Sequence, residues 1–232
     1  MRGNLDSISL VLDINPGVSS SNPTALTSIN NILYFSADDG IHGEELWMSD
    51  GTPEGTIRLT DINEGSKNSS PRDISEGPDG IYFSAIKDKV GRELWRLNDD
   101  SQSATRIVTA DKGKKKLKAL DDSNDEFRFE LADQFGKAKA DRITGFSPDD
   151  GDKLALSTSA FPGLSEINLV TVSSKRQLKA QQTLPSNIIY FEAKGKLYFD
   201  QNATEKGYGK GGGLFAILKG GPDLTESSFQ II

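Results

Sequence analysis

The chain has 232 residues, 34 of them acidic and 27 basic, for a net charge of −7, with no cysteine and one histidine. This composition excludes a disulfide-bonded scaffold, a cysteine-ligated metal and a Cys–His catalytic pair. Residues 1–109 carry 17 Asp and Glu against 9 Lys and Arg, so this half is unsuited to neutralising the phosphates of a nucleic acid.

The chain has no run of about 18 apolar residues, so we expect no membrane insertion. Residues 1–4 are not followed by an apolar segment, and we therefore expect no cleaved signal peptide at this N-terminus. Two interpretations follow. Either the chain is cytosolic, or its export signal lies elsewhere or was lost with a truncated start.

An internal repeat with a period of 48 residues organises the first half. Positions 13–49 and 61–97 share fourteen identities without a gap. The repeated residues are Asp13-Ile14-Asn15, Gly17, Ser21, Pro23, Tyr34-Phe35-Ser36-Ala37, Gly43 and Glu45-Leu46-Trp47. This period is typical of β-propeller blades, which have about 40–50 residues and four strands. We therefore predict two blades, residues 13–60 and 61–108.

Short segments rich in β-branched and aromatic residues predict the strands of the first blade. These are Ala25–Ile29, Ile32–Ala37, Glu45–Ser49 and Thr56–Thr60, separated by Asn-Asn and Asp-Gly turns. Residues 8–12 precede Asp13 as the end of the first blade precedes Asp61, and they are predicted to be the last strand of an earlier blade. Closure of a propeller needs about 4–8 blades, so this array is incomplete.

The segment Glu45-Leu-Trp-Met-Ser-Asp-Gly-Thr-Pro-Glu-Gly-Thr56 resembles the ELWxxDGT repeat of bacterial extracellular proteins. The second copy keeps Glu93-Leu94-Trp95 and then departs from the motif, as a terminal repeat often does. The resemblance covers residues 8–108 and implies an all-β fold. The residues that define the repeat are Trp47, Trp95, Tyr34, Tyr82, Asp50 and Gly51.

Two alternatives attach to the repeated residues. Trp47 and Trp95 either fill the interior of each blade, which their fixed phase favours, or stack on sugar rings. Asp38-Asp39-Gly40 and Asp50-Gly51 either form turns without an ion or hold Ca²⁺ through their oxygens. We expect interior tryptophans and ion-free turns.

The pattern changes after residue 109. Residues 110–124 are rich in Lys, Asp and Ser and are predicted to be a solvated linker. In residues 125–232, Phe127-Arg-Phe129 alternates like a strand, and Ser174–Gln182 is the one helix-like segment. We predict a mainly β C-terminal domain with at most one short helix.

The segment from Ala140 to Ser157 closely resembles the one that closes repeats-in-toxin calcium-binding regions, in a version found on cyanobacterial surface proteins. The resemblance covers residues 123–232 and implies a role in secretion. It also implies that Ca²⁺ is bound by Asp141, Asp149, Asp150 and Asp152. The glycine-rich nonapeptide that supplies the family's calcium ligands is absent from the sequence, so these aspartates are alternatively surface turns.

The segment Asp223–Ile232 is acidic and polar, and it ends in apolar residues. It resembles the tails of repeats-in-toxin substrates, which implies an uncleaved signal for a type I exporter. The alternative, which does not exclude the first, is that Phe229, Ile231 and Ile232 form a final strand packed on the domain.

Catalysis finds little support in the sequence. A Ser–His–Asp triad would have to use His42, which we expect in an exposed turn, and the chain has no P-loop or dinucleotide fingerprint. We expect a non-enzymatic extracellular or cell-surface protein for adhesion, whose partner is a surface protein or polysaccharide. Two alternatives are the C-terminal region of a secreted hydrolase with its catalytic domain upstream, and a carbohydrate-binding propeller.

Overall fold

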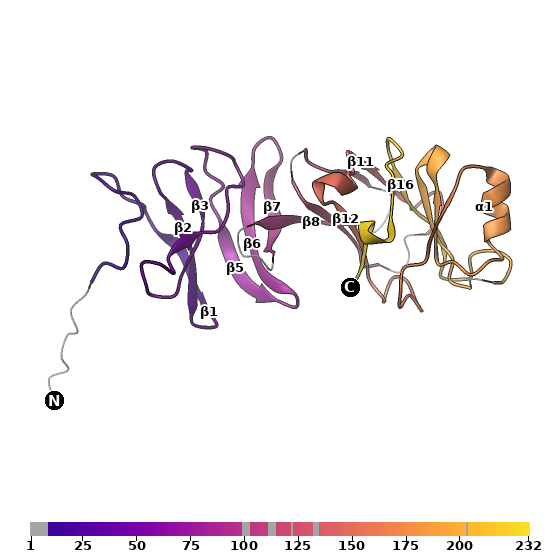
Figure 1. The fold of residues 1–232 in the computed structure, drawn as a ribbon, viewed down its shortest axis with the longest axis horizontal. Coiled ribbons are helices and arrows are strands. Elements are labelled where there is room, and N and C mark those ends of the chain that lie inside the picture. Colours follow the sequence, from indigo (N-terminus) through magenta and orange to yellow (C-terminus); the bar gives the residue numbers. More distant parts are fainter. Residues whose placement is uncertain (1–8, 99–102, 111–114, 122, 132–134, 203) are drawn as a thin grey trace, which may run out of the picture. The chain divides into compact units, whose positions relative to one another are not determined.

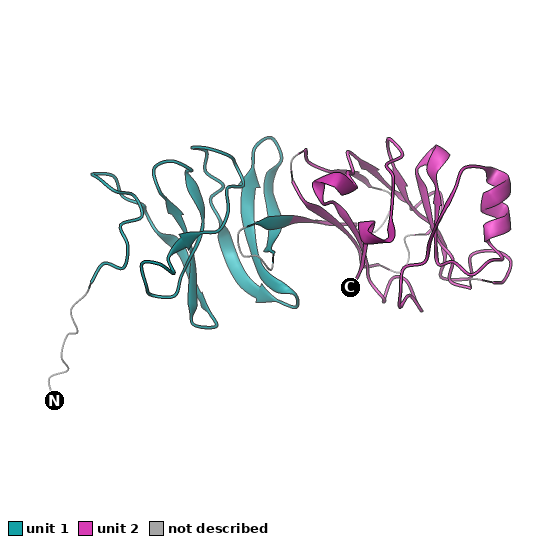
Figure 2. Cartoon of the chain, viewed as in Figure 1, with its two compact units in different colours: residues 1–105 teal, residues 106–232 magenta. Residues whose placement is uncertain are grey.

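The computed structural model is mainly β: strands make up 40% of the residues and helices 8%. It describes residues 9–98, 103–110, 115–121, 123–131, 135–202 and 204–232. The chain divides into unit 1, residues 1–105, and unit 2, residues 106–232 (Figure 2). Within the described ranges, no helix has both the length and the apolar character needed to cross a membrane. The all-β prediction is confirmed at this level.

Unit 1 consists of antiparallel strands that pair in chain order (Figure 1). The first sheet contains β1 (Thr24–Ile29), β2 (Ile32–Asp38), β3 (Glu44–Ser49) and β4 (Ile57–Arg58). The next strands are β5 (Arg72–Gly77), β6 (Gly80–Lys87) and β7 (Gly91–Leu97), followed by β8 (Ala104–Thr109), in which the boundary between the units falls. All four strands predicted for the first repeat (residues 13–60) are present, and β4 is shorter than predicted.

The sequence repeat is also a repeat of backbone geometry. The β1–β2 pair joins Ile29 to Ile32, and the β5–β6 pair joins Gly77 to Gly80, 48 positions later. Each pair has an irregularity at the start of its first strand, where Ala25 and its equivalent Asp73 take φ angles of 52° and 56°. The second repeat (from residue 61) thus has the same irregularity in its first strand as the first repeat has.

The two repeats of unit 1 pack against each other through one hydrophobic cluster. Leu46 and Leu59 of the first repeat meet side chains from the second repeat. The latter are Ile62, Ile74, Phe83, Ala85, Trp95 and Leu97. Full burial of side chains of this size contributes about 1.5–3 kcal/mol each. This cluster is therefore the main attraction between the repeats.

Unit 2 contains nine further strands among its described residues. They are β9 (Lys116–Lys118), β10 (Asp125–Phe129), β11 (Asp141–Thr144), β12 (Lys153–Leu156), β13 (Leu169–Val172), β14 (Ile188–Phe191), β15 (Lys196–Phe199), β16 (Gly213–Leu218) and β17 (Phe229–Ile231). The α-helix α1 spans Lys175–Gln181, and three short 3₁₀ helices span Pro148–Asp150, Glu192–Lys194 and Glu226–Ser228. Helix α1 begins with a capping box, in which Ser174 and Gln177 each bond the other's backbone.

Successive strands of unit 2 alternate between two parallel ladders. One ladder has the order β8-β10-β12-β17, and the other contains β9, β11 and β16. This winding is that of a parallel β-solenoid, in which each turn adds one strand to each sheet. The second ladder continues through the antiparallel strands β15 and β14 to β13. Residues 110–124 were predicted to be a solvated linker, but strand β9 forms within them because its backbone pairs with that of β11.

The interior of unit 2 is rich in phenylalanine. Phe161 lies edge-on to Phe135, Phe199 and Phe215, with ring centroids 5.1 to 5.5 Å apart. Edge-to-face pairs of this kind add about 0.5–1.5 kcal/mol each beyond their burial. Phe229 of β17 joins the same cluster, so the predicted final strand is present.

Candidate functional site

The two tryptophans of the repeat lie in the interior of unit 1. Trp47 is 7% exposed and Trp95 is 3% exposed. The indole N–H of Trp47 donates to the carbonyl of Ala37 at 3.1 Å. Neither ring presents a free face on which a sugar could stack, so in this structure both have a packing role.

The repeated tyrosines also serve the packing. Tyr82 is 9% exposed and donates through its hydroxyl to Asp79, while Tyr34 packs against the cluster between the repeats. Burial, and then the nearby Glu76 charge, raise the pKa of Tyr34 above its ordinary value. The Tyr34 hydroxyl is thus protonated at neutral pH.

The Asp-Gly-Thr turn of the repeat motif is held by its own hydrogen bonds. Asp50 accepts from the backbone N–H of Thr52 at 2.8 Å and from its hydroxyl at 2.7 Å. These bonds hold the pKa of Asp50 below its ordinary value. Gly51 has a φ of 93°, a conformation that favours glycine. The turn's own hydrogen bonds and the glycine therefore account for its conformation.

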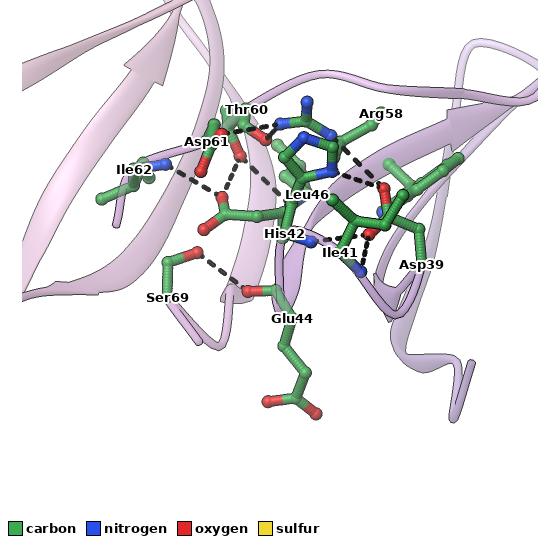
Figure 3. Close-up of polar contacts among 12 residues, drawn as sticks. Asp39, Ile41, His42, Glu44, Leu46, Arg58, Thr60, Asp61, Ile62 and Ser69 are labelled. Carbon is green, nitrogen blue, oxygen red and sulfur yellow. Dashed lines mark hydrogen bonds and ion pairs between the residues drawn. The ribbon is translucent and has the colours of Figure 1, made fainter. Parts of the chain in front are cut away.

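The glutamate of the motif ties the two repeats together. The carboxylate of Glu45 is fully buried and accepts from the hydroxyl of Thr60 at 2.7 Å and the N–H of Ile62 at 3.1 Å (Figure 3). The Thr60 hydroxyl in turn accepts from the N–H of Leu46. Burial raises the pKa of Glu45 despite these bonds. Its role is that of a buried acceptor between β3 and the start of the second repeat.

His42 is hydrogen-bonded to Asp39 in the same loop, between β2 and β3 (Figure 3). Its Nδ1 lies 2.7 Å from Asp39 Oδ2, and Arg58 Nε lies 3.8 Å from the same oxygen. Burial alone would raise the pKa of Asp39, but the hydrogen bonds from His42 and Ile41 outweigh it and lower that pKa. Within the described part of the chain, no serine hydroxyl is hydrogen-bonded to His42. The structure thus does not assemble a triad around it.

Asp152, one of the four aspartates for which calcium is implied, is buried beneath its turn. Its two carboxylate oxygens accept from the backbone N–H groups of Asp125 and Ser147, both at 2.9 Å. Burial raises the pKa of Asp152 to about 6, and the Asp125 charge adds to this effect. Both oxygens are therefore committed to the backbone.

The other three aspartates have different surroundings. Asp141 is buried and accepts from the N–H of Lys115 at 2.6 Å, whereas Asp149 and Asp150 are exposed in a 3₁₀ turn. No three Asp, Glu or His side chains gather as a metal site in the ranges that the structure describes. Calcium binding by this segment stays a prediction.

A pocket of about 300 Å³ lies between the two repeats of unit 1. The first repeat lines it with Thr24, Ser36 and Glu44, and the second with Ser70, Arg72 and Arg92. The hydroxyl of Ser70 donates to the Glu44 carboxylate at 2.7 Å. Nη1 of Arg92 donates to the carbonyl oxygens of Ser70 and Ser84, each at 3.0 Å. The pocket is thus lined by the side chains of two arginines and one glutamate and by several hydroxyl groups.

These pocket residues were not predicted from the sequence. A signal was present in the repeat itself, since Glu44 is replaced by Arg92 and Thr24 by Arg72 at equivalent positions. Charge changes at equivalent positions show where two otherwise similar repeats differ in their surface chemistry.

Comparison of the chain with protein-family models, curated proteins and solved structures gave no match. The resemblances to ELWxxDGT repeats and to repeats-in-toxin regions therefore rest on the residues quoted for them.

Proposed function

We propose that this chain is a non-enzymatic, extracellular or cell-surface repeat protein that acts in adhesion. The first half would consist of ELWxxDGT repeats arranged as propeller-like blades, and the second of a repeats-in-toxin-like domain. The repeats would present a binding surface to a polysaccharide or protein of a cell surface.

The observation that carries this proposal is the role of the motif residues. Glu45, Trp47 and Asp50 each make a contact that builds the repeat or joins it to the next one. When the most regular residues of a chain serve its scaffold, the variable positions between them are left to bind. This is the logic of repeat proteins, in which stacked units present one extended surface.

Binding to surfaces tests the adhesion proposal directly. The chain has no cysteine, so a single introduced cysteine allows specific labelling. We expect saturable binding of the labelled chain to intact bacterial cells or to isolated cell-envelope polysaccharide. The variant expected to lose binding is Trp95→Ala, because it disrupts the packing between the repeats. Absence of saturable binding to both surfaces would contradict the proposal.

The second half supports secretion by a type I exporter. The alternating parallel strands β8 to β12 have the winding expected of a repeats-in-toxin region. The test expresses the whole chain, fused behind a passive reporter, in a host that carries such an exporter. We expect the fusion in the medium, and we expect deletion of residues 223–232 to retain it in the cell. An intact, soluble fusion found only inside the cell would end this part of the proposal.

A carbohydrate-binding function is the second candidate, and the pocket between the repeats favours it. It is concave, and several polar groups converge on it, as the polar groups that orient a bound small molecule do. This candidate is compatible with adhesion to a polysaccharide.

A further inference from the structure

The pocket between the repeats contains a buried hydroxyl that lacks a partner. Ser36 is 1% exposed, lines the pocket, and its Oγ has no hydrogen-bond partner. Leaving a polar group buried and unpaired is unfavourable. A hydroxyl of this kind at a cavity is therefore available to a ligand atom.

The equivalent serine of the second repeat shows what Ser36 lacks. Ser84 donates to Asp73 at 2.7 Å and accepts from Arg92 at 3.1 Å. In the first repeat the positions of Asp73 and Arg92 are occupied by Ala25 and Glu44. Ser36 therefore lacks the two partners that Ser84 has, and the two residues at those positions both line the pocket.

Two guanidinium groups in the pocket are free to bind an anion. All three hydrogen bonds of Arg92 use Nη1, which leaves Nε and Nη2 for a ligand among the described contacts. Arg72 is exposed, and its side chain makes no hydrogen bond or ion pair with any residue that the structure describes. Burial, followed by the charge of Arg72, lowers the pKa of Arg92. An anion between the two groups would relieve this repulsion.

The remaining groups select among anions. Glu44 repels a bare anion, but its carboxylate accepts hydrogen bonds from a ligand hydroxyl, and Ser36 offers a second polar contact. Ala25 and Pro71 add apolar wall. A ligand that carries a carboxylate at one end and hydroxyls on a compact ring matches all of these features, and about 300 Å³ is enough room for a single sugar.

We propose that the pocket formed by Ser36, Glu44, Arg72 and Arg92 binds a hexuronic acid, with its carboxylate on the two arginines and its hydroxyls on Ser36 and Glu44. Arginine is suited to this role because its planar fork binds a carboxylate through two parallel hydrogen bonds. The inference does not depend on adhesion, since a free monosaccharide is the ligand tested.

The test is titration of the full chain with glucuronate, with methyl glucoside and acetate as comparators, followed by calorimetry and by NMR shifts. We expect glucuronate alone to bind at millimolar concentration. Arg72→Gln should weaken binding roughly 10- to 100-fold, as loss of a charged hydrogen bond does, and Ser36→Ala roughly 2- to 10-fold. Arg176→Gln, which removes an exposed charge from α1 in unit 2, is the matched control and should bind as the wild type does.

Three outcomes would overturn the proposal. They are no shift with glucuronate, equal weakening by Arg72→Gln and Arg176→Gln, and acetate binding as tightly as glucuronate. The last would show that the pocket recognises charge alone. A chain that binds glucuronate but no cell surface would keep this inference and refute adhesion. The exposed position of Arg72 makes its variant safe for folding, which circular dichroism verifies.

Discussion

The first and second repeats of unit 1 have equivalent strands, but equivalent side chains on those strands are buried to different extents. Leu46 of the first repeat is fully buried, whereas its equivalent Leu94 is 44% exposed. Leu46 lies in the cluster that includes Trp95 of the following repeat. Burial of this leucine is therefore a property of the junction between repeats, and the motif alone does not provide it.

The motif glutamates differ in the same way. Glu45 is buried and bonded to Thr60, while Glu93 is half-buried and has Val108 at the position equivalent to Thr60. A buried carboxylate needs donors, and the segment that begins the next repeat provides them. The same three letters of the motif thus make different contacts in the two copies.

The largest effect should come from the two leucines. We expect Leu46→Ala to cost about 2–5 kcal/mol of unfolding free energy, the usual range for a buried leucine. Leu94→Ala should cost less than about 1 kcal/mol, because Leu94 is 44% exposed and less of its surface is removed from water. Both tryptophans of the chain lie in unit 1, so urea denaturation followed by tryptophan fluorescence reports this unit. Equal costs would refute the junction argument.

The next largest difference in stability is expected between alanine variants of two equivalent glycines. A Cβ at Gly43 would lie 2.7 Å from the backbone of Lys67, whereas one at Gly91 meets nothing within 4 Å. Both glycines have positive φ, which costs an alanine about 1–2 kcal/mol. Overpacking adds about 1–3 kcal/mol at Gly43 alone. We therefore expect Gly43→Ala to lower the urea midpoint more than Gly91→Ala, and the reverse order would contradict the close approach.

The third prediction concerns a substitution that gives the first repeat the residue found at the equivalent position of the second. Thr60→Val removes a hydroxyl that serves both Glu45 and Leu46, and places there the residue type found at Val108. Leaving these groups unpaired should cost about 1–3 kcal/mol. Thr60→Ser, which keeps the hydroxyl, is the control. If the valine variant is as stable as the serine variant, the hydroxyl does not stabilise the junction.

The smallest effect is the pH dependence introduced by Glu45. Its pKa is raised in the folded protein, so its contribution to stability is present below the ordinary value of 4.5 and is lost as pH rises through the folded value. Glu45→Gln cannot ionise. We therefore expect the stability of this variant relative to wild type to improve as pH rises above about 4.5. Parallel stability curves over this range would contradict a raised pKa.

Local patterns in the sequence predicted much of unit 1 and the single helix. Strands β1 to β3 lie between turn dipeptides, and Asn30 and Asn31 take the positive φ angles that such turns require. Helix α1 was predictable because Ser174 caps it from an adjacent position. Signals of this kind act within a few residues.

Long-range pairing explains what the sequence did not predict. Strand β9 lies in a lysine-rich stretch that has the composition of a linker, and it forms because Lys116 pairs with Arg142. The buried ion pair of Arg106 and Asp125, with atoms 2.7 Å apart, joins residues that are distant in sequence. The pocket around Ser36 depends on a contact between repeats. Composition and periodicity do not encode which distant segments meet.

The pairing of β12 with β17 has a consequence for the order of folding. This pair joins Leu154 to Phe229, so one ladder of unit 2 is completed only when residues far apart along the chain have come together. Contacts of such long range slow folding, because the entropy of closing the loop is lost before the contacts form. The edge of this ladder therefore stays unpaired during synthesis until residue 229 has left the ribosome.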